Sequence, residues 1–160
     1  MHSLILMVLL AMATAWLATR PTGGSWLQDL RMPGWAPALA WLALGWSAAW
    51  ALETLAAWQA WRTAPRHGAR LTAAWLVQLG LWTLWAWTLL EWHRPGWALA
   101  VITGSWLLQV AMLAMARGLG GAVVTALAPG LLWLSFLWLL NLSVWRLNGG
   151  GLASLLAQGL

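Results

Sequence analysis

Long apolar stretches, separated by short clusters of arginine, glycine and proline, run through the whole sequence. Four of them carry no charged residue, over residues 3–19, 71–90, 95–116 and 118–145, and a fifth, over 35–61, is interrupted only by Glu53. A helix needs roughly 20 mostly apolar residues to cross a bilayer. The pattern therefore predicts an all-α integral membrane protein, a five transmembrane helix bundle. We expect its helices at about residues 3–19, 38–61, 71–91, 97–116 and 122–147.

The composition fits a membrane protein. The chain is 62% hydrophobic and 7% charged, with a mean hydropathy of +0.75, which is far from the usage of soluble globular domains. We expect one transmembrane domain, residues 1–148, and a flexible C-terminal tail, 149–160. The first apolar stretch also fits a cleaved signal peptide ending near Ala13-Thr14-Ala15. It lacks a basic n-region, however, and this favours a retained helix.

The basic residues indicate contact with lipid rather than with nucleic acid. The net charge is +5, and all eight basic residues are arginines at the ends of predicted helices, where they can meet lipid phosphates. Five crossings place four arginines on each side of the membrane, so the positive-inside rule leaves the orientation undetermined. The N-terminal side carries Arg62, Arg66, Arg70 and Arg117, and the other side carries Arg20, Arg31, Arg94 and Arg146.

Residues for conventional catalysis are missing from the sequence. Cysteine is absent, which excludes disulfides and thiolate metal sites. No histidine falls within a predicted span, so haem ligation is not expected. The sequence also lacks a Ser/His/Asp arrangement, a phosphate loop and a carboxylate pair. We therefore expect no metal site, no obligatory cofactor and no ordinary hydrolytic chemistry.

Tryptophan is the most unusual feature of the composition, with 18 among 160 residues. Tryptophans near helix ends fit the aromatic belt at the lipid–water boundary. A rise of about 1.5 Å per residue instead places Trp46, Trp82 and Trp133 near one level in the middle of the membrane. Indole rings at one level suit stacking on a flat aromatic ligand. The alternative is that these bulky side chains only fill the bundle.

Several motifs follow one another in a characteristic order. Trp26 precedes Pro33-Gly34-Trp35-Ala36-Pro37, and Trp46 follows. Later the chain has Gln78-Leu79-Gly80-Leu81 with Trp85, and then Pro129-Gly130-Leu131-Leu132-Trp133 with Phe136. Over about residues 22–148 this order resembles the translocator protein family, also called TspO or tryptophan-rich sensory proteins. The chain departs from the family where Leu27, Trp50 and Gly130 replace its tyrosines and Trp82 replaces its helix III asparagine.

The resemblance implies a five-helix bundle in a bacterial envelope, often a homodimer, with a porphyrin pocket beneath the first loop. It implies a function as sensor, scavenger or light- and oxygen-dependent degrader of a porphyrin of the protoporphyrin IX type. A carrier of porphyrin, sterol or lipid, and a non-catalytic regulator of a neighbouring membrane complex, are the alternatives. Trp46 and Trp133 match the tryptophans of porphyrin breakdown and are the expected catalytic residues. The expected ligand-binding residues are Trp26, Leu27, Trp35, Trp46, Trp50, Trp82, Trp85, Trp133, Phe136, Leu137, Leu140 and Asn141.

Charged residues add two further expectations. A porphyrin carries propionates, and the guanidinium group is well shaped for carboxylates. Arg31 and Arg94 are on the same side as the first loop, so we expect them to pair with propionates, although anchoring at headgroups is the alternative. Glu53 is an acid within a predicted span, which marks it as a functional candidate. A carboxyl group that hydrogen-bonds to Gln78 or Gln109 and holds helices together is the structural alternative.

Overall fold

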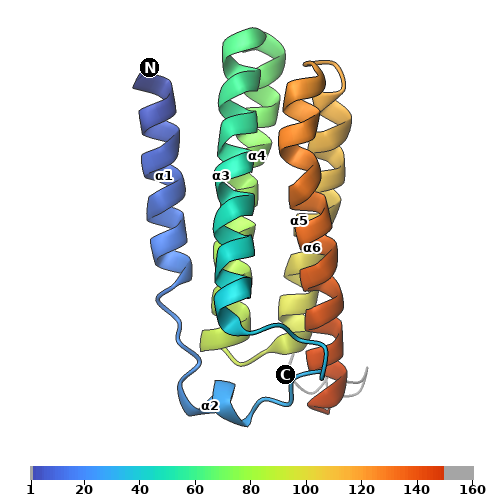
Figure 1. Ribbon diagram of the computed structural model, residues 1–160. Helices are drawn as coiled ribbons and strands as arrows, with labels where there is room; N and C mark the ends of the chain where they lie inside the picture. The colour runs from blue at the N-terminus through green and yellow to red at the C-terminus, as the bar shows by residue number, and fades with distance from the viewer. Residues whose placement is uncertain (1, 150–160) are drawn as a thin grey trace.

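The computed structural model describes residues 2–149, which form a bundle of long helices without strands (Figure 1). The bundle consists of α1 (His2–Ala18), α3 (Leu39–Thr63), α4 (Pro65–Ala86), α5 (Pro95–Ala116) and α6 (Gly121–Leu147). A short helix, α2 (Gly24–Asp29), lies in the first loop, and a π-helical segment, η1 (Trp87–Glu91), continues α4. The all-α class is confirmed. Apart from Gly149, the predicted tail lies outside the described residues.

Four helical segments are long and apolar enough to cross a membrane: Leu39–Thr63, Pro65–Glu91, Pro95–Ala116 and Gly121–Leu147. The first helix, α1, is apolar but has only 17 residues. At about 1.5 Å per residue it falls short of a hydrocarbon core of about 30 Å. The integral membrane bundle is thus confirmed, while the fifth crossing remains a prediction.

Two helices begin before their predicted starts at 71 and 97. Pro65 occupies the first turn of α4, and Pro95 that of α5. Proline is favoured there because its fixed φ suits the helix and its missing N–H would have no partner within it. The apolar pattern marks where the hydrocarbon begins, whereas these helices extend into the polar boundary.

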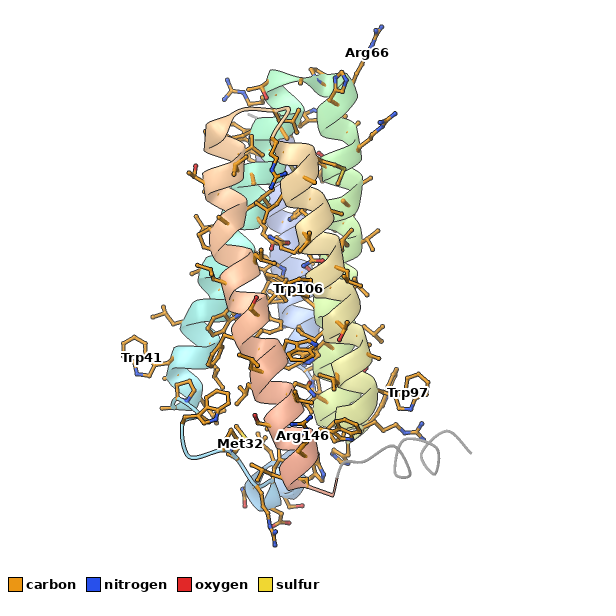
Figure 2. All side chains as sticks on the ribbon, turned by 90° about the vertical axis from the view of Figure 1, so that its right-hand side faces the viewer. Met32, Trp41, Arg66, Trp97, Trp106 and Arg146 are labelled. Atoms are coloured by element: carbon orange, nitrogen blue, oxygen red, sulfur yellow. The ribbon has the colours of Figure 1, made fainter. Side chains whose placement is uncertain are left out.

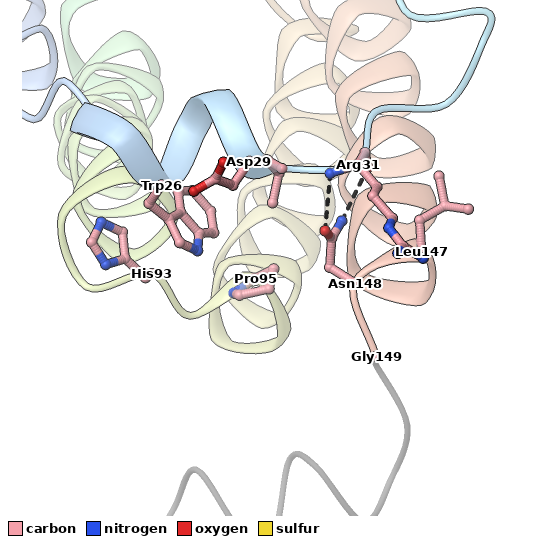
Figure 3. Close-up of a pocket in the computed structure, with 9 residues that line it drawn as sticks. Trp26, Asp29, Arg31, His93, Pro95, Leu147, Asn148 and Gly149 are labelled. Atoms are coloured by element: carbon pink, nitrogen blue, oxygen red, sulfur yellow. Dashed lines mark hydrogen bonds between the residues drawn. The ribbon is translucent and has the colours of Figure 1, made fainter.

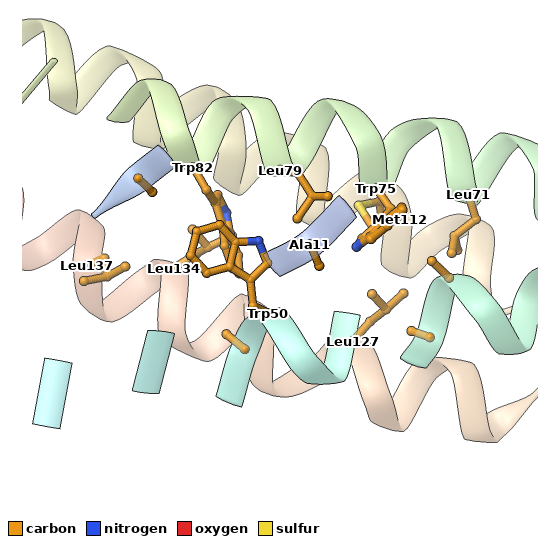
Figure 4. Packing of buried hydrophobic residues seen from close by; sticks show 14 of the residues in the cluster. Ala11, Trp50, Leu71, Trp75, Leu79, Trp82, Met112, Leu127, Leu134 and Leu137 are labelled. Carbon is orange, nitrogen blue, oxygen red and sulfur yellow. The ribbon is translucent and has the colours of Figure 1, made fainter. Parts of the chain in front are cut away.

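The two ends of the bundle differ in construction. One, here called the turn end, holds the α3–α4 and α5–α6 turns and the beginning of α1; the other, the loop end, holds α2 and the end of α6 (Figure 1). Near the turn end, Trp75 and Met112 are buried in one core with small residues of α3: Ala56, Ala57 and Ala60 (Figure 4 shows Trp75 and Met112). A Cβ on Gly68 would meet the Ala60 carbonyl. Helices α3 and α4 therefore approach closely here.

Helix α1 stands apart from the other long helices (Figure 1). It buries only Met7, Ala11 and Ala18. On the α4 side, the Thr83 hydroxyl donates to the Thr14 carbonyl at 3.3 Å, and Trp87 Nε1 donates to the Leu17 carbonyl at 3.0 Å. Within residues 2–149, no hydrogen bond joins α1 to α3. The first helix thus packs against both α3 and α4, and its hydrogen bonds to the bundle come from α4 and η1.

Some tryptophans face outward near the loop end. Trp41 and Trp97 project from opposite sides of the bundle in Figure 2, with 66% and 46% of their surface exposed. Arg66 extends from the turn end in the same view. This arrangement is typical of side chains at a lipid–water boundary. Trp106, by contrast, lies within the bundle, where its Nε1 donates to Ser135 Oγ at 2.9 Å.

Candidate functional site

A cavity of about 330 Å³ opens beneath the first loop, and we call it the aromatic cavity. Helices α1, α3, α4 and α6 form its walls, and η1 and the loop close it toward the loop end. Its lining is mostly apolar, with Thr19, Ser47 and Asn141 as the polar exceptions. The tryptophans that line it are Trp46, Trp50 and Trp85. A cavity of this kind suits an apolar molecule with an aromatic face.

Four indoles gather at this cavity around Trp46, and we call them the indole cluster. The Trp46 ring stacks on that of Trp85, with centroids 5.0 Å apart and planes 22° apart. It also lies 5.2 Å from the Trp82 ring and 5.7 Å from the Trp50 ring. Trp50 and Trp82 are themselves 5.4 Å apart. Helices α3 and α4 thus each contribute two rings to one continuous aromatic surface.

Hydrogen bonds fix two of these rings. Trp85 Nε1 donates to Asn141 Oδ1 at 2.8 Å, and Asn141 Nδ2 donates to the Pro95 carbonyl at 2.9 Å. Trp82 Nε1 donates to Ser105 Oγ at 2.9 Å. In contrast, Trp50 Nε1 is buried and has no partner among the described residues. Hydrogen bonds thus hold the rings of Trp85 and Trp82 in place, and these two rings in turn fix the position of the Trp46 ring that they contact.

Most of the expected ligand-binding residues reach the aromatic cavity. Trp46, Trp50 and Trp85 line it together with four further expected residues, which are Leu27, Leu137, Leu140 and Asn141. Trp82 does not line it but supports Trp46 and Trp50 from within the core, where it is almost fully buried. The expected level of Trp46 and Trp82 agrees with their ring contact. Their role in ligand binding stays a prediction.

Trp133 lies elsewhere, although the sequence places it at a similar depth. Its ring stacks on Phe136 at 5.2 Å, and Phe136 meets Trp35 edge-on at 6.0 Å. None of the three lines the aromatic cavity. A Cβ on Gly45 would collide with the Trp133 ring, so this glycine of α3 makes the space that the indole fills. The two expected catalytic tryptophans therefore belong to different aromatic groups.

Arg31 and Trp26 line a second pocket, of about 390 Å³, at the surface of the loop end (Figure 3). Trp26 stacks on His93, with centroids 4.7 Å apart. The Asn148 side chain accepts from the Arg31 backbone N–H and donates to its carbonyl, both at 3.0 Å. Leu30 lines both this pocket and the aromatic cavity. Arg94, which precedes α5, lines neither of them.

Glu53 is fully buried in a layer of polar side chains that we call the polar layer: Glu53, Gln78 and Gln109. Its carboxyl oxygens have no hydrogen-bond partner among the described residues. A Cβ on Gly130 would lie 2.6 Å from Glu53 Oε1 and 2.7 Å from Gln109 Nε2. Gly130 therefore provides the space in which the carboxyl group and the amide come together.

The two glutamines connect the polar layer to neighbouring helices. Gln109 Nε2 donates to the Leu127 carbonyl at 3.0 Å. The Gln78 amide fits in two orientations. In one, its Nε2 donates to Gln109 Oε1 at 3.3 Å; in the other, its Oε1 accepts from Trp82 Nε1 and from Ser105 Oγ, each at 3.0 Å. The polar layer thus lies directly beside the indole cluster.

The sequence reasoning overlooked Ser105, Gly45 and Asn148. Ser105 could have been found, because it lies one helical turn before Gln109 and therefore on the same face of an otherwise apolar helix. Gly45 and Asn148 carry no comparable signal. A glycine in an apolar helix and an asparagine beyond a helix end each have many ordinary uses.

The sequence of this chain is similar to those of known proteins. The sequence model of the TspO/MBR family matches residues 3–146. Protein CrtK of Rhodobacter capsulatus is 27% identical over 129 residues, an overlap of 79% of this chain and 81% of CrtK.

Proposed function

Because this chain belongs to the TspO/MBR family, we propose that it binds a porphyrin-type tetrapyrrole in the aromatic cavity, within a bacterial envelope. One observation carries the proposal: Trp46 presents its ring to an apolar cavity while stacked at 5.0 Å on Trp85. A flat macrocycle can stack on this surface, as aromatic pairs prefer. The cavity volume of about 330 Å³ falls within the range of about 300–1,000 Å³ for small-molecule sites.

The polar groups of such a ligand would point toward the loop end. Leu30 separates the aromatic cavity from the pocket that holds Arg31. A porphyrin with its ring against Trp46 would extend its propionates past this residue toward the guanidinium group. Charge-assisted hydrogen bonds to carboxylates are strong, so Arg31 is the better propionate partner. Arg94, outside both pockets, fits headgroup contact.

The binding test is a titration of the protein in lipid nanodiscs with protoporphyrin IX, followed by tryptophan quenching and porphyrin absorbance. Replacing Trp46 with leucine keeps the site apolar but removes the stacking face. We expect Trp46→Leu to bind roughly 3- to 10-fold more weakly, as the loss of a stacking term of about 0.5–1.5 kcal/mol predicts. Trp97→Leu, on the lipid-facing surface, is the matched control. Equal affinities in the two variants would remove the aromatic cavity as the site.

Illumination of the complex in the presence of oxygen separates breakdown from carriage. A photoexcited porphyrin can take one electron from the Trp46 indole. Addition of dioxygen to the reduced macrocycle, with return of the electron to the indole radical, puts both oxygen atoms into the ring, so that dioxygen is the oxidant consumed and Trp46 is regenerated. Loss of bound-porphyrin absorbance in the wild-type protein, but less in Trp46→Leu at equal occupancy, supports a degrader. Stable absorbance supports a sensor, scavenger or carrier. A protein that binds no porphyrin at all would favour the regulator of a neighbouring complex.

A further inference from the structure

We propose that the aromatic cavity receives its ligand sideways from the bilayer, through the contact between α1 and α3, rather than from water through the first loop. We call this contact the α1–α3 seam. The inference rests on the proposed function, since it concerns how a ligand reaches the same cavity. Four features of the cavity, the seam and the loop carry it.

A groove continues from the cavity along the seam. This groove, of about 370 Å³, lies along α1 and α3. It shares Ala15, Ser47 and Trp50 with the aromatic cavity. The two hollows are therefore neighbours with common walls. Both lie along the first helix at the level of the hydrocarbon, so a ligand that moves from the groove into the cavity passes Ala15 and Ser47.

Small side chains line the groove along the seam, together with the larger Val8, Met12, Trp50 and Leu55. Ala11 and Ala15 of α1 face Ser47 and Ala51 of α3 across the groove. The Ser47 hydroxyl donates to the Ala43 carbonyl of its own helix at 2.9 Å, so its hydrogen is satisfied without a partner on α1. No hydrogen bond within residues 2–149 ties α1 to α3. The seam is therefore held by packing alone, and α1 buries only three residues, so its separation from α3 breaks no hydrogen bond among the described residues.

The cavity also reaches the outer surface of the bundle at α3. Leu39, Ala43 and Ser47 line it and are exposed, Leu39 with 65% of its surface. These residues recur at every fourth position, so they form one face of the helix. Because these side chains are exposed on a helix long and apolar enough to cross a membrane, this face meets lipid. A bilayer-dissolved macrocycle meets this opening without crossing the polar boundary.

The water-facing side is closed by comparison. Leu27, Leu30 and Met32 of the first loop line the cavity from that side. The loop is fixed at one point by the two hydrogen bonds between Asn148 and the Arg31 backbone, and at another by the stacking of Trp26 on His93 (Figure 3). A ligand arriving from water would have to break these contacts and displace apolar side chains.

A reversible tether across the seam tests the path. The natural chain contains no cysteine, so Ala15→Cys/Ser47→Cys supplies the only two thiols. They are joined in nanodiscs by a cleavable bifunctional thiol reagent with a spacer of a few carbon atoms. The control, Thr14→Cys/Thr83→Cys, ties α1 to α4 at an existing contact. Protoporphyrin IX is delivered from protein-free vesicles, and the rate of tryptophan quenching is measured before and after cleavage.

We expect the seam tether to slow association at least tenfold, with recovery on cleavage, and the α1–α4 tether to change it less than twofold. In a second arm, Asn148→Ala loosens the loop and should leave the rate within twofold. An unchanged rate with the seam tethered overturns the proposal. A marked acceleration in Asn148→Ala also overturns it, because it identifies the loop as the gate.

A further measurement separates failure of this path from failure of the proposed function. If the untethered protein binds no porphyrin, the proposed function fails, and the seam is then tested with lipid alone. A small fluorophore on Ser47→Cys should be quenched by dibrominated acyl chains about as strongly as one on Leu132→Cys, a residue 74% exposed on α6. Absence of quenching at Ser47, with quenching at Leu132, would show a closed seam and overturn the inference.

Discussion

The turn end and the loop end of the bundle use tryptophan in opposite ways. At the turn end, Trp75 is almost fully buried in a core that also contains the alanines of α3. At the loop end, Trp46 and Trp50 of α3 face Trp82 and Trp85 of α4. Large side chains opposite small ones allow membrane helices to approach, whereas large opposite large holds them apart. Whether a tryptophan in this bundle lies in a packed core or beside a cavity therefore depends on the size of the side chains on the facing helix.

The polar layer lies between these two regions. Glu53, Gln78 and Gln109 come from three helices, and Gly130 of α6 makes the space that the carboxyl group and the Gln109 amide require. In lipid, polar groups gain by finding one another. The hydrogen bond from Gln109 to the Leu127 carbonyl joins α5 to α6 at the level where the filled region ends and the indole cluster begins.

The largest expected effect is on stability, from Trp75→Ala. Removing a fully buried indole from the filled region should lower the free energy of unfolding by about 3–5 kcal/mol. Trp46→Ala should cost clearly less, because its ring already borders a cavity. Denaturant titrations in matched micelles, followed by circular dichroism, give both values. Equal losses would contradict the distinction between the two regions.

An intermediate effect is expected from Gly130→Ala. The added methyl group would meet Glu53 Oε1 and Gln109 Nε2, and overpacking of this kind costs about 1–3 kcal/mol. Glu53→Ala in the same chain should relieve the contact, so the double variant should be more stable than the sum of the single losses predicts. If the two losses in the free energy of unfolding were strictly additive, the contact with Glu53 would not be the cause of the destabilisation by Gly130→Ala.

The smallest effect is expected from Glu53→Gln. The amide has nearly the same shape as the carboxyl group and can donate to neighbouring oxygens. We expect the free energy of unfolding to change by less than about 1 kcal/mol, because the carboxyl group makes no hydrogen bond among the described residues that the amide would lose, and protoporphyrin affinity to stay the same. The titration described above measures this affinity. A loss of binding or of light-dependent breakdown would instead give Glu53 a functional role.

The sequence was sufficient for the fold class and for part of the candidate site. Apolar runs determine where a chain can cross a bilayer, so the long helices were predictable. The depth of a residue follows from its position in the helix, and this brought Trp46 and Trp82 to one level. The depth of a residue does not determine in which direction around the helix axis its side chain points, or which neighbouring helix it meets. Trp133 therefore packs against Gly45, a contact that only the relative placement of α3 and α6 determines.

The π-helical segment η1 has a consequence for how the shape of this binding site can change. Its Trp92 N–H reaches back to the Trp87 carbonyl, so the turn holds one residue more than an α-helical turn. Deleting a single residue there would restore ordinary helical winding and rotate the preceding turns by about 100° relative to the following ones. Leu89 and Leu90, which line the cavity, would then face another direction. The insertion or deletion of one residue at this position is therefore enough to change the shape of the cavity wall.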